Sequence, residues 1–297
     1  MKRLITLWSM IVLLGTGYTR AGTWTTLDAP QAQGATWITG ISGSNLVGYY
    51  QNNSGGITSF LYNGTSWTPL VTPWADVGVM GISGSNLVGS YNTGIDHGCF
   101  YNGSTWTTLD VPGAIATIIN GISGSNLVGY YQNAPPGTNQ HGFLYNTMTQ
   151  VWTTIDKPGA SSVSIFGIDG SNLVGEYYEA YTDQHGFLYN TATETWTTID
   201  NPGGGVCWTG ISGCNLVGNE GSHGVLYDRT TWTTLDPPGS ILTYVYGIEG
   251  DKIVGHYLAF DGVYTSGHGF VYTIPEPATL SLLALGGLCI LVRGMRR

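Results

Sequence analysis

The apolar positions of this sequence fall in short runs separated by glycine, serine, asparagine and proline. A run such as Leu-Val-Gly-Tyr-Tyr at 127–131 is rich in strand-forming residues, and the Gly-Ser-Asn before it supplies the positive φ angles of a tight hairpin. The stretch that begins at Trp106 is also short and alternates residue types as a half-buried strand does. The pattern therefore predicts an all-β protein built from short strands and tight turns.

Three sequence elements recur in the same order along the chain. The first is Gly-Ile-x-Gly-x-x-Leu/Ile-Val-Gly, and its copies begin at Gly40, Gly81, Gly121, Gly167, Gly210 and Gly247. The second is His-Gly-Phe-Leu-Tyr at 141–145 and 185–189, with variants at 58–62, 97–101, 223–227 and 268–272. The third is Trp-Thr-Thr-Leu/Ile-Asp, and its copies begin at Trp24, Trp106, Trp152, Trp196 and Trp232, with a divergent copy at Trp67. This self-similarity indicates six structural repeats.

Each repeat is predicted to form four short strands, which is the size of a β-propeller blade. The repeat region begins with an isolated fourth strand at Trp24 and ends on a third strand at His268. The N-terminal strand can therefore complete the sixth blade. The same spacing permits an open β-solenoid. We expect a closed six-bladed propeller, because closure removes exposed sheet edges.

The N-terminal segment has the layout of a secretory signal peptide. Basic residues at 2–3 precede an apolar run at 4–15, and a small-x-small pattern at 19–21 permits cleavage before Gly22. We therefore expect a signal peptide at 1–21, a six-repeat domain at 22–274 and a separate C-terminal tail at 275–297.

The C-terminal tail carries three features in a fixed order. Pro275, Glu276 and Pro277 precede an apolar stretch at 280–292, and the basic end consists of Arg293, Arg296 and Arg297. This arrangement resembles the PEP-CTERM sorting signal of bacteria that make extracellular polysaccharide. The resemblance implies processing by an exosortase-type protease. It also implies transient anchoring in the inner membrane through a hydrophobic transmembrane helix, followed by delivery to the cell surface or the extracellular space.

The repeats themselves are similar to a known family of extracellular repeats. Over residues 23–272 the order Gly-Ile, Ile-Val-Gly, His-Gly-Phe and Leu-Asp-x-Pro-Gly resembles the HAF repeats of bacterial secreted proteins. The chain has glycine where the family name implies alanine, at Gly98, Gly142, Gly186, Gly224 and Gly269. The resemblance implies secretion and a repeat architecture.

Without its two ends, the repeat domain is strongly acidic. Residues 22–274 contain three basic residues, Lys157, Arg229 and Lys252, against seventeen Asp and Glu, a formal charge of −14. A surface of this sign does not attract nucleic acid or an anionic membrane. The charge favours cations and neutral polymers as partners.

The residue types most able to carry chemistry recur once per repeat, which indicates structural roles because an active site is a single place. These residues are His97, His141, His185, His223 and His268, and Asp28, Asp110, Asp156, Asp200 and Asp236. The sequence contains no histidine pair with metal-site spacing, no Asp-rich calcium loop and no Gly-x-Ser-x-Gly motif. We therefore expect no metal, no cofactor and no catalytic residue, and we expect Cys99, Cys207 and Cys214 to stay unpaired.

Chemistry specific to one repeat is expected in the segments that differ between repeats, above all after the second strand. The fourth repeat has the richest such loop, which contains Glu176, Tyr177, Tyr178, Glu179, Tyr181 and Asp183. Carboxylates beside tyrosines can bind a sugar by stacking and hydrogen bonding, or hold a cation. The same residues can also form an ordinary solvated loop.

Two functional hypotheses follow. The first is an exported cell-surface or matrix protein whose non-catalytic repeat domain binds glycan or another surface protein. The second is a secreted propeller hydrolase or lyase that acts on extracellular polysaccharide, an analogy of fold alone. A glycosidase needs two carboxylates at a defined spacing across a cleft, and the acidic candidates form no such pair in the sequence. We therefore favour the first hypothesis.

Overall fold

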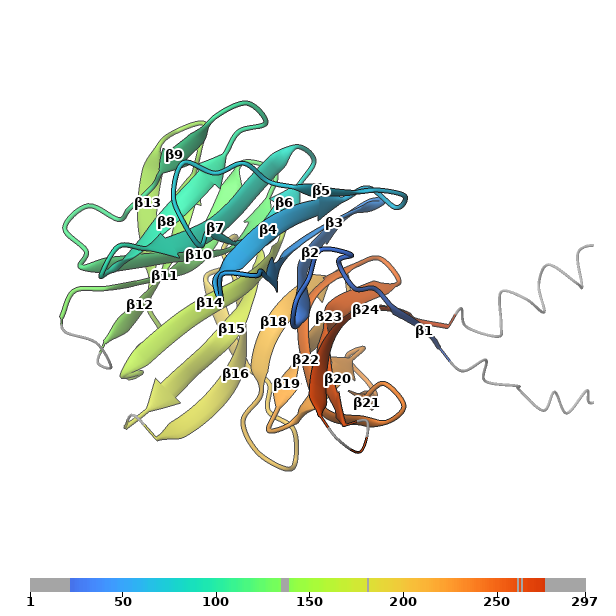
Figure 1. The fold of residues 1–297 in the computed structure, drawn as a ribbon. Helices are drawn as coiled ribbons and strands as arrows, with labels where there is room; N and C mark the ends of the chain where they lie inside the picture. Colours follow the sequence, from blue (N-terminus) through green and yellow to red (C-terminus); the bar gives the residue numbers. More distant parts are fainter. Residues whose placement is uncertain (1–21, 135–138, 181, 261, 263, 276–297) are drawn as a thin grey trace, which may run out of the picture. The chain divides into compact units, whose positions relative to one another are not determined.

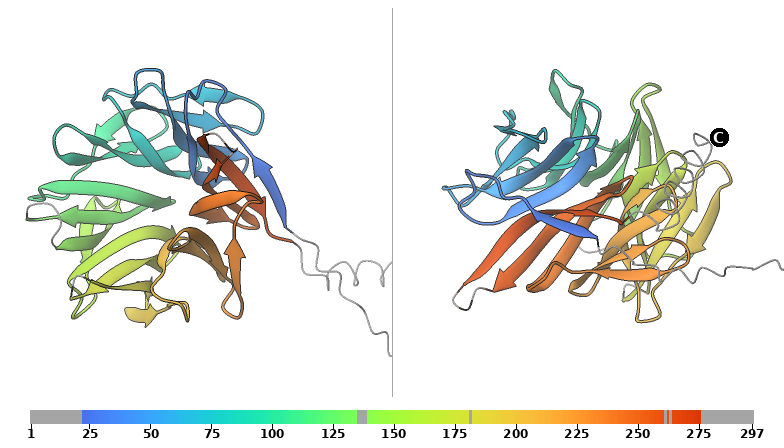
Figure 2. Two further views of the ribbon diagram at one scale, coloured as in Figure 1. Left: turned by 60° about the horizontal axis from the view of Figure 1, so that its bottom comes forward. Right: turned by 90° about the vertical axis from the view of Figure 1, so that its right-hand side faces the viewer.

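A computed structural model of the protein describes residues 22–134, 139–180, 182–260, 262 and 264–275. The regular secondary structure of these residues consists of β-strands alone, as predicted. Six antiparallel sheets of four strands stand around a common axis as the blades of a propeller (Figures 1 and 2). The compact unit is Trp24–Thr273. The hydrophobic helix expected near the C-terminus lies outside the described residues.

Blades 1 to 3 take their strands in chain order. Blade 1 comprises β2 (Thr36–Ser42), β3 (Asn45–Gln51), β4 (Ile57–Tyr62) and β5 (Trp67–Pro69). Blade 2 comprises β6 (Gly78–Ser83), β7 (Asn86–Asn92), β8 (Asp96–Tyr101) and β9 (Trp106–Thr108). Blade 3 comprises β10 (Ala116–Ser123), β11 (Asn126–Gln132), β12 (Gln140–Asn146) and β13 (Val151–Ile155).

Blades 4 and 5 follow the same order, whereas blade 6 uses both ends of the domain. Blade 4 comprises β14 (Ser162–Asp169), β15 (Asn172–Glu179), β16 (Asp183–Asn190) and β17 (Thr195–Thr198). Blade 5 comprises β18 (Cys207–Ser212), β19 (Asn215–Glu220), β20 (His223–Tyr227) and β21 (Trp232–Leu235). Blade 6 comprises β22 (Ser240–Glu249), β23 (Lys252–Phe260), β24 (Thr265–Thr273) and β1 (Thr23–Thr26).

The ring is closed by its first strand. β1 is the outer strand of blade 6, beside β24, and just beyond it the backbone N–H of Leu27 donates to the carbonyl of Gly269 at 2.8 Å. At the axis each first strand contacts the first strand of the next blade, and β22 contacts β2. The predicted closed propeller is therefore confirmed, and the open solenoid is excluded.

The blades are held together by alternation along each second strand. In blade 1 Leu46 packs within its own blade's cluster, whereas Val47 packs beside Val79 and Ile82 of blade 2. The corresponding valines of blades 2, 3, 4 and 6 also lie in the clusters of the next blade, and these are Val88, Val128, Val174 and Val254. Because successive side chains of a strand point to opposite faces, Leu-Val supplies one apolar group to each interface. Full burial of each such side chain contributes about 1.5–3 kcal/mol.

A β-bulge precedes every Gly-Ile. The pairing register between first and second strands shifts at the same place in all six blades, which leaves one residue of each first strand unpaired. In the second strand, the glycine of Leu-Val-Gly lies beside the bulge. A Cβ built on Gly129, for example, would lie 1.9 Å from the carbonyl oxygen of Ile118. The repeated glycine is therefore required by a close backbone approach.

The variable position of Gly-Ile-x-Gly joins neighbouring blades. Its side-chain oxygen accepts a hydrogen bond from the turn glycine N–H of the following blade, as between Ser83 and Gly124 at 3.1 Å and between Asp169 and Gly213 at 2.8 Å. Glu249 of blade 6 accepts from Gly43 of blade 1 in the same way. This explains why the position carries Ser, Asp or Glu.

Candidate functional site

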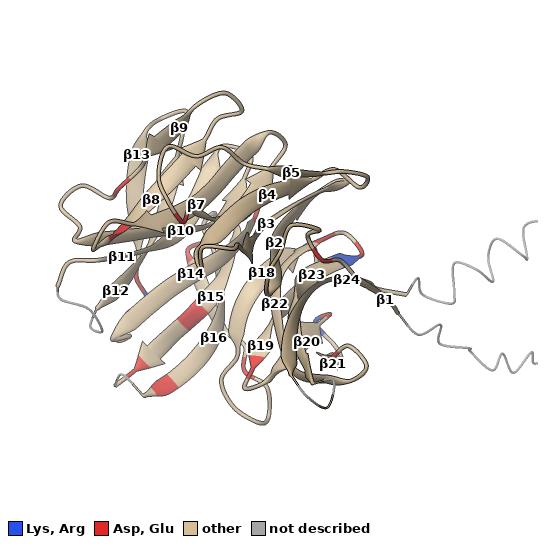
Figure 3. Cartoon of the chain, in the orientation of Figure 1, with Lys and Arg blue, Asp and Glu red and all other residues tan. Residues whose placement is uncertain are grey.

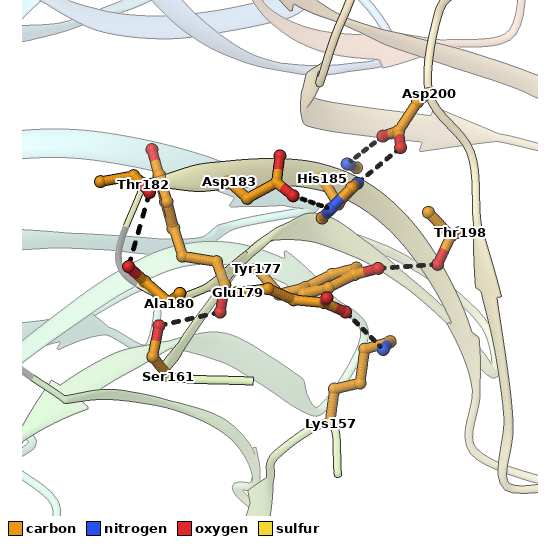
Figure 4. A network of polar contacts seen from close by, with 12 residues as sticks. Lys157, Ser161, Tyr177, Glu179, Ala180, Thr182, Asp183, His185, Thr198 and Asp200 are labelled. Carbon is orange, nitrogen blue, oxygen red and sulfur yellow. Dashed lines mark hydrogen bonds and ion pairs between the residues drawn. The ribbon is translucent and has the colours of Figure 1, made fainter. Parts of the chain in front are cut away.

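The recurring histidines and aspartates bind one another. In blade 4 the Nδ1 atom of His185 lies 2.7 Å from Oδ2 of Asp200, whose Oδ1 accepts the Gly186 N–H at 2.8 Å. Tyr177 stacks on the imidazole with ring centroids 5.0 Å apart, and its hydroxyl lies 2.9 Å from Oγ1 of Thr198 (Figure 4). The other pairs are His97–Asp110, His141–Asp156, His223–Asp236 and His268–Asp28, all at 2.6 to 2.8 Å.

These pairs belong to the fold. Each joins the start of the third strand to the residue that follows the fourth, and so fixes how the outer strand ends. The hydrogen bond that the His185 ring donates to Asp200 raises the pKa of His185. In the described residues no group of three or more His, Cys, Asp or Glu is placed to hold a metal ion.

The recurring tryptophans pack on the third strand. The Trp152 ring lies 5.0 Å from Phe143 and 4.3 Å from Tyr145 between centroids, and equivalent contacts recur in the other blades. Cys99, Cys207 and Cys214 are free in the structure. The sequence signalled the structural role of these residues by repetition, but it did not reveal the pairing of histidine with aspartate.

The residues expected in a loop of blade 4 lie largely in strands, which corrects the sequence-based prediction. β15 continues through Glu179 and β16 begins at Asp183, so Glu176, Tyr177, Tyr178 and Glu179 are strand residues. The long Asn172–Glu179 strand stays paired with β16 up to its last residue, Glu179 opposite Asp183. Tyr181 lies outside the described residues.

Alternation along β15 places Tyr177 and Glu179 on one face and Glu176 and Tyr178 on the other. Tyr177 is 3% exposed and is covered by Lys157, whose ammonium lies 4.2 Å from the ring centroid. Glu179 is exposed and lies 3.8 Å from the Lys157 Nζ, and exposed Asp183 lies 3.5 Å from Nε2 of His185 (Figure 4). Tyr177 thus serves the core, whereas Glu179 and Asp183 face solvent at the tip of the hairpin.

Glu176 points to the interface with blade 5. Its Oε2 accepts from Nε2 of Gln184 at 2.5 Å, and it also contacts the Cys207 thiol. Burial raises the pKa of Glu176, and burial together with the adjacent carboxylate raises the pKa of Cys207. Two residues further along β15, burial raises the pKa of Tyr178, and the charge of Glu176 raises it further. The structure therefore keeps Tyr177, Glu179 and Asp183 on one side of the hairpin and directs Glu176 to the interface with blade 5.

The channel along the propeller axis is nearly filled. The six bulged residues line it together with the glycine and isoleucine of each first strand, and they are Thr39, Met80, Asn120, Phe166, Thr209 and Tyr246. The cavity that remains is about 80 Å³, which holds a few water molecules but no sugar ring.

Small polar and large side chains alternate around this channel. In blades 1, 3 and 5 the bulged residue donates to a carbonyl of the next blade: Thr39 to Val79 at 2.7 Å, Asn120 to Ile165 at 2.9 Å and Thr209 to Val245 at 2.9 Å. Blades 2, 4 and 6 supply Met80, Phe166 and Tyr246, which fill space. Sequence analysis did not predict this ring of bulged side chains, although the residue before each Gly-Ile differs from repeat to repeat.

One histidine stands apart from the repeated pairs. His256 of β23 is 6% exposed, stacks on Tyr244 and Tyr246 and lies 3.1 Å from the Tyr246 hydroxyl through Nδ1. Burial lowers the pKa of His256 to about 4, so the ring is neutral at physiological pH.

A larger cavity of about 470 Å³ lies at the edge of blade 1, between residues 52–59 and 70–77. Blade 1 is the repeat in which Thr58 and Val71 replace the histidine and the aspartate. The cavity is lined by Trp74, Asp76, Asn52 and Ser54 among others. It is within the 300–1,000 Å³ range of small-molecule sites.

Acidic residues are spread over several sheets of the propeller, and basic residues are few (Figure 3).

The C-terminal residues match a known sorting signal. Residues 273–297 fit the model of the PEP-CTERM protein-sorting motif. The chain carries a PEP-CTERM sorting motif. This motif implies export and processing by an exosortase-type protease, and it signals a cell-surface or extracellular location. Of the predicted motif residues, Pro275 is described, whereas Glu276, Pro277, Arg293, Arg296 and Arg297 lie outside the described residues.

Two solved structures with TM-scores above 0.5 support the fold alone. TolB from Acinetobacter baumannii is similar with a TM-score of 0.53 and 12% identity, over 78% of this chain and 65% of TolB. A puromycin-hydrolyzing peptidase from Mycobacterium tuberculosis has a TM-score of 0.53 and 11% identity, over 84% of this chain and 54% of the peptidase. Aleuria aurantia lectin, in complex with a fucosylated sugar, has a TM-score of 0.49 and 15% identity, over 82% of this chain and 97% of the lectin.

No curated protein matches the sequence, and the HAF-type resemblance stays a prediction. A helix with the length and hydropathy of a membrane span is absent from the described residues.

Proposed function

We propose that this is an exported surface or matrix protein whose propeller binds an extracellular glycan without cleaving it. The observation that carries the proposal is the PEP-CTERM motif attached to a propeller whose recurring histidines and aspartates are bound to one another. The motif directs the domain to the outside of the cell, and the pairs make it a rigid ring whose repeated polar groups are already used.

The charge of the domain supports a neutral polymer as the ligand. Residues 22–274 have a formal charge of −14. Two of their three basic side chains are engaged, Lys157 with Glu179 and Tyr177, and Arg229 through its Nε donating to the Cys214 carbonyl at 3.1 Å. An anionic polymer would meet like charge with few cations to offset it.

Binding is supported over cleavage by the carboxylates near the cavities. Among the described residues, the channel cavity has no carboxylate in its lining and the blade 1 cavity has one, Asp76. Glycosidases act with a pair of carboxylates. Glu179 and Asp183, at the tip of the β15–β16 hairpin, are candidate acceptors for glycan hydroxyls within this proposal.

The test is binding of the full chain, purified in mild detergent, to immobilised neutral and acidic bacterial exopolysaccharides, with release of reducing sugar measured in parallel. We expect salt-insensitive binding to a neutral polysaccharide and no release. Binding to surface proteins alone, or turnover of any polysaccharide, would refute the proposal.

We also propose that the tail anchors the protein in the inner membrane only until it is processed. Replacement of Pro275, Glu276 and Pro277 by alanine should leave full-length protein in the membrane fraction of a host with exosortase. The mass of the released wild-type protein should show loss of the tail. Release of the triple-alanine variant with the same mass would contradict this.

A further inference from the structure

The first blade departs from the other five where they carry the histidine–aspartate pair. Thr58 takes the place of the histidine, and its Oγ1 accepts from Nδ2 of Asn52 at 3.2 Å. Val71 takes the place of the aspartate and is 90% exposed. The fourth strand is still held, because the Leu70 N–H donates to the Ser59 carbonyl at 2.8 Å. Blade 1 therefore lacks the histidine–aspartate cross-link of the other blades but keeps the pairing of its fourth strand.

A cavity of about 470 Å³ occupies this part of blade 1. Its two walls are the segment that follows β3 and the segment that follows β5, at residues 52–59 and 70–77. The channel cavity, at about 80 Å³, is too small for a sugar. Of these two cavities, the blade 1 cavity is therefore the one with room for a small organic ligand.

One wall of the cavity presents an indole ring held in a fixed position. Trp74 stacks on Tyr91 of blade 2 with centroids 4.2 Å apart and planes at 6°. Oγ1 of Thr72 donates to the Trp74 carbonyl at 2.8 Å. Tyr91 covers one face of the ring, so the cavity meets the remaining surface. The Trp74 indole N–H has no hydrogen-bond partner in the described part of the chain.

The rest of the lining, on both walls, supplies hydroxyl, amide and carboxylate groups. Oδ1 of Asp76 accepts the Ile57 N–H at 2.8 Å, and Asp76 has a φ of 49°, a conformation that aspartate tolerates better than most residues. Gly56 allows this approach, since a Cβ there would lie 2.3 Å from Oδ1 of Asp76. Asn52 orders the loop by accepting from the Ser54 and Gly56 N–H groups at 3.0 and 3.2 Å.

We propose that this cavity is a sugar-binding site that takes one neutral hexose unit, an inference that rests on the proposed glycan-binding function. An indole surface fits the C–H face of a pyranose, and Asp76, Ser54 and the indole N–H can exchange hydrogen bonds with its hydroxyls. The lining contains no Lys or Arg, so a sulfate or uronate group would meet a carboxylate without a cation. The ligand chemistry that fits is therefore a neutral sugar.

The test uses the full chain and three neutral disaccharides, cellobiose, mannobiose and galactobiose, with digalacturonate as the acidic comparison. Affinity is measured by calorimetry. The indole N–H resonance of Trp74 is followed by NMR and assigned by its loss in Trp74→Phe. We expect one neutral disaccharide to bind and shift that resonance, and digalacturonate to bind at least tenfold more weakly.

Two variants locate the site, and a third is the control. Trp74→Ala removes the platform, and Ser54→Tyr fills the cavity from an exposed position without touching the core. Each should weaken binding at least tenfold. Trp232→Ala is matched to Trp74→Ala, because Trp232 stacks on Tyr227 of blade 5 as Trp74 stacks on Tyr91. It should bind as the wild type does.

Retained affinity in Ser54→Tyr, equal loss in Trp232→Ala or no disaccharide binding by the wild type would overturn the site. If immobilised polysaccharide still binds in those cases, the proposed function stands and only the cavity assignment fails. If the wild type binds no polysaccharide at all, the proposed function fails with it.

Discussion

Nδ1 of His268 lies 2.8 Å from Oδ2 of Asp28, although 240 positions separate the two residues in the sequence. In blades 2 to 5 the same pair joins residues 13 or 15 positions apart. The bond that elsewhere fixes one outer strand here also closes the ring, because Asp28 follows β1 and His268 lies in β24. Asp28 also accepts the Gly269 N–H through Oδ1 at 3.2 Å.

Asp28→Ala should therefore loosen the ring at its closure. Loss of the two hydrogen bonds should cost about 1–3 kcal/mol. Hydrogen exchange measured by mass spectrometry should speed up in β1 and β24. Asp156→Ala is the control, since it breaks the equivalent bond to His141 inside blade 3. It should leave exchange in β1 and β24 at the wild-type rate, and equal exchange in both variants would contradict the closing role.

Asp200→Asn should make stability less dependent on pH. The hydrogen bond that His185 donates to Asp200 raises the pKa of His185 above its unfolded value. The stabilisation is therefore fully present below about pH 6.5 and is lost as pH rises through the folded pKa. The loss of Tm in the variant should be larger at pH 5.5 than at pH 8.5. Asp183→Asn, at the exposed carboxylate 3.5 Å from Nε2, should change stability by less than about 0.5 kcal/mol. A pH-independent loss in Asp200→Asn would argue against a charged pair.

Gly129→Ala should destabilise the protein far more than Gly124→Ala in the same blade. A Cβ on Gly129 would meet the Ile118 carbonyl at 1.9 Å, whereas Gly124 has a φ of 58° and open space around it. The first change forces a backbone clash, for which we expect about 3 kcal/mol or more, and the second costs about 1 kcal/mol of conformational strain. Urea unfolding of both variants checks the order. Equal costs would mean that the bulge in β10 does not fix the glycine of β11.

Glu176→Gln should raise Tm at pH 7. Burial raises the pKa of Glu176, so the ionised carboxylate destabilises the folded state once pH exceeds the unfolded value near 4.5. Glutamine keeps an acceptor for Gln184 and carries no charge. The gain should shrink as pH falls and disappear at pH 4. Glu179→Gln at the exposed end of β15 should leave Tm unchanged, and a lower Tm for Glu176→Gln at pH 7 would reject the explanation.

The repeated motifs predicted most of the fold. Gly-Ser-Asn, Leu-Val-Gly and the alternating segment at Trp152 are local signals, and each describes a turn or a strand within a few residues. The isolated strand element at Trp24 predicted closure because the last repeat lacks one. The role of the recurring polar residues could be anticipated from repetition alone, since five copies of each cannot make one active site.

The site was harder to predict because it depends on pairing between blades. Glu176 and Tyr177 are neighbours in sequence, yet alternation along β15 sends the first toward Cys207 and the second beneath Lys157. A strand prediction that ended at Gly175, four residues before the end of β15, therefore placed both in one loop. No local pattern marks the contact of Trp74 with Tyr91.

The sequence by itself determined the number of blades, the strands within them, the order of closure and the sorting motif, because each is written in a short pattern or a repeat. Only the tertiary structure decided that His268 pairs with Asp28, that the bulged residues alternate in size around the channel, and that the first blade holds a cavity where the other blades hold a cross-link. These features depend on which faces of separate sheets meet, and a one-dimensional period does not specify that.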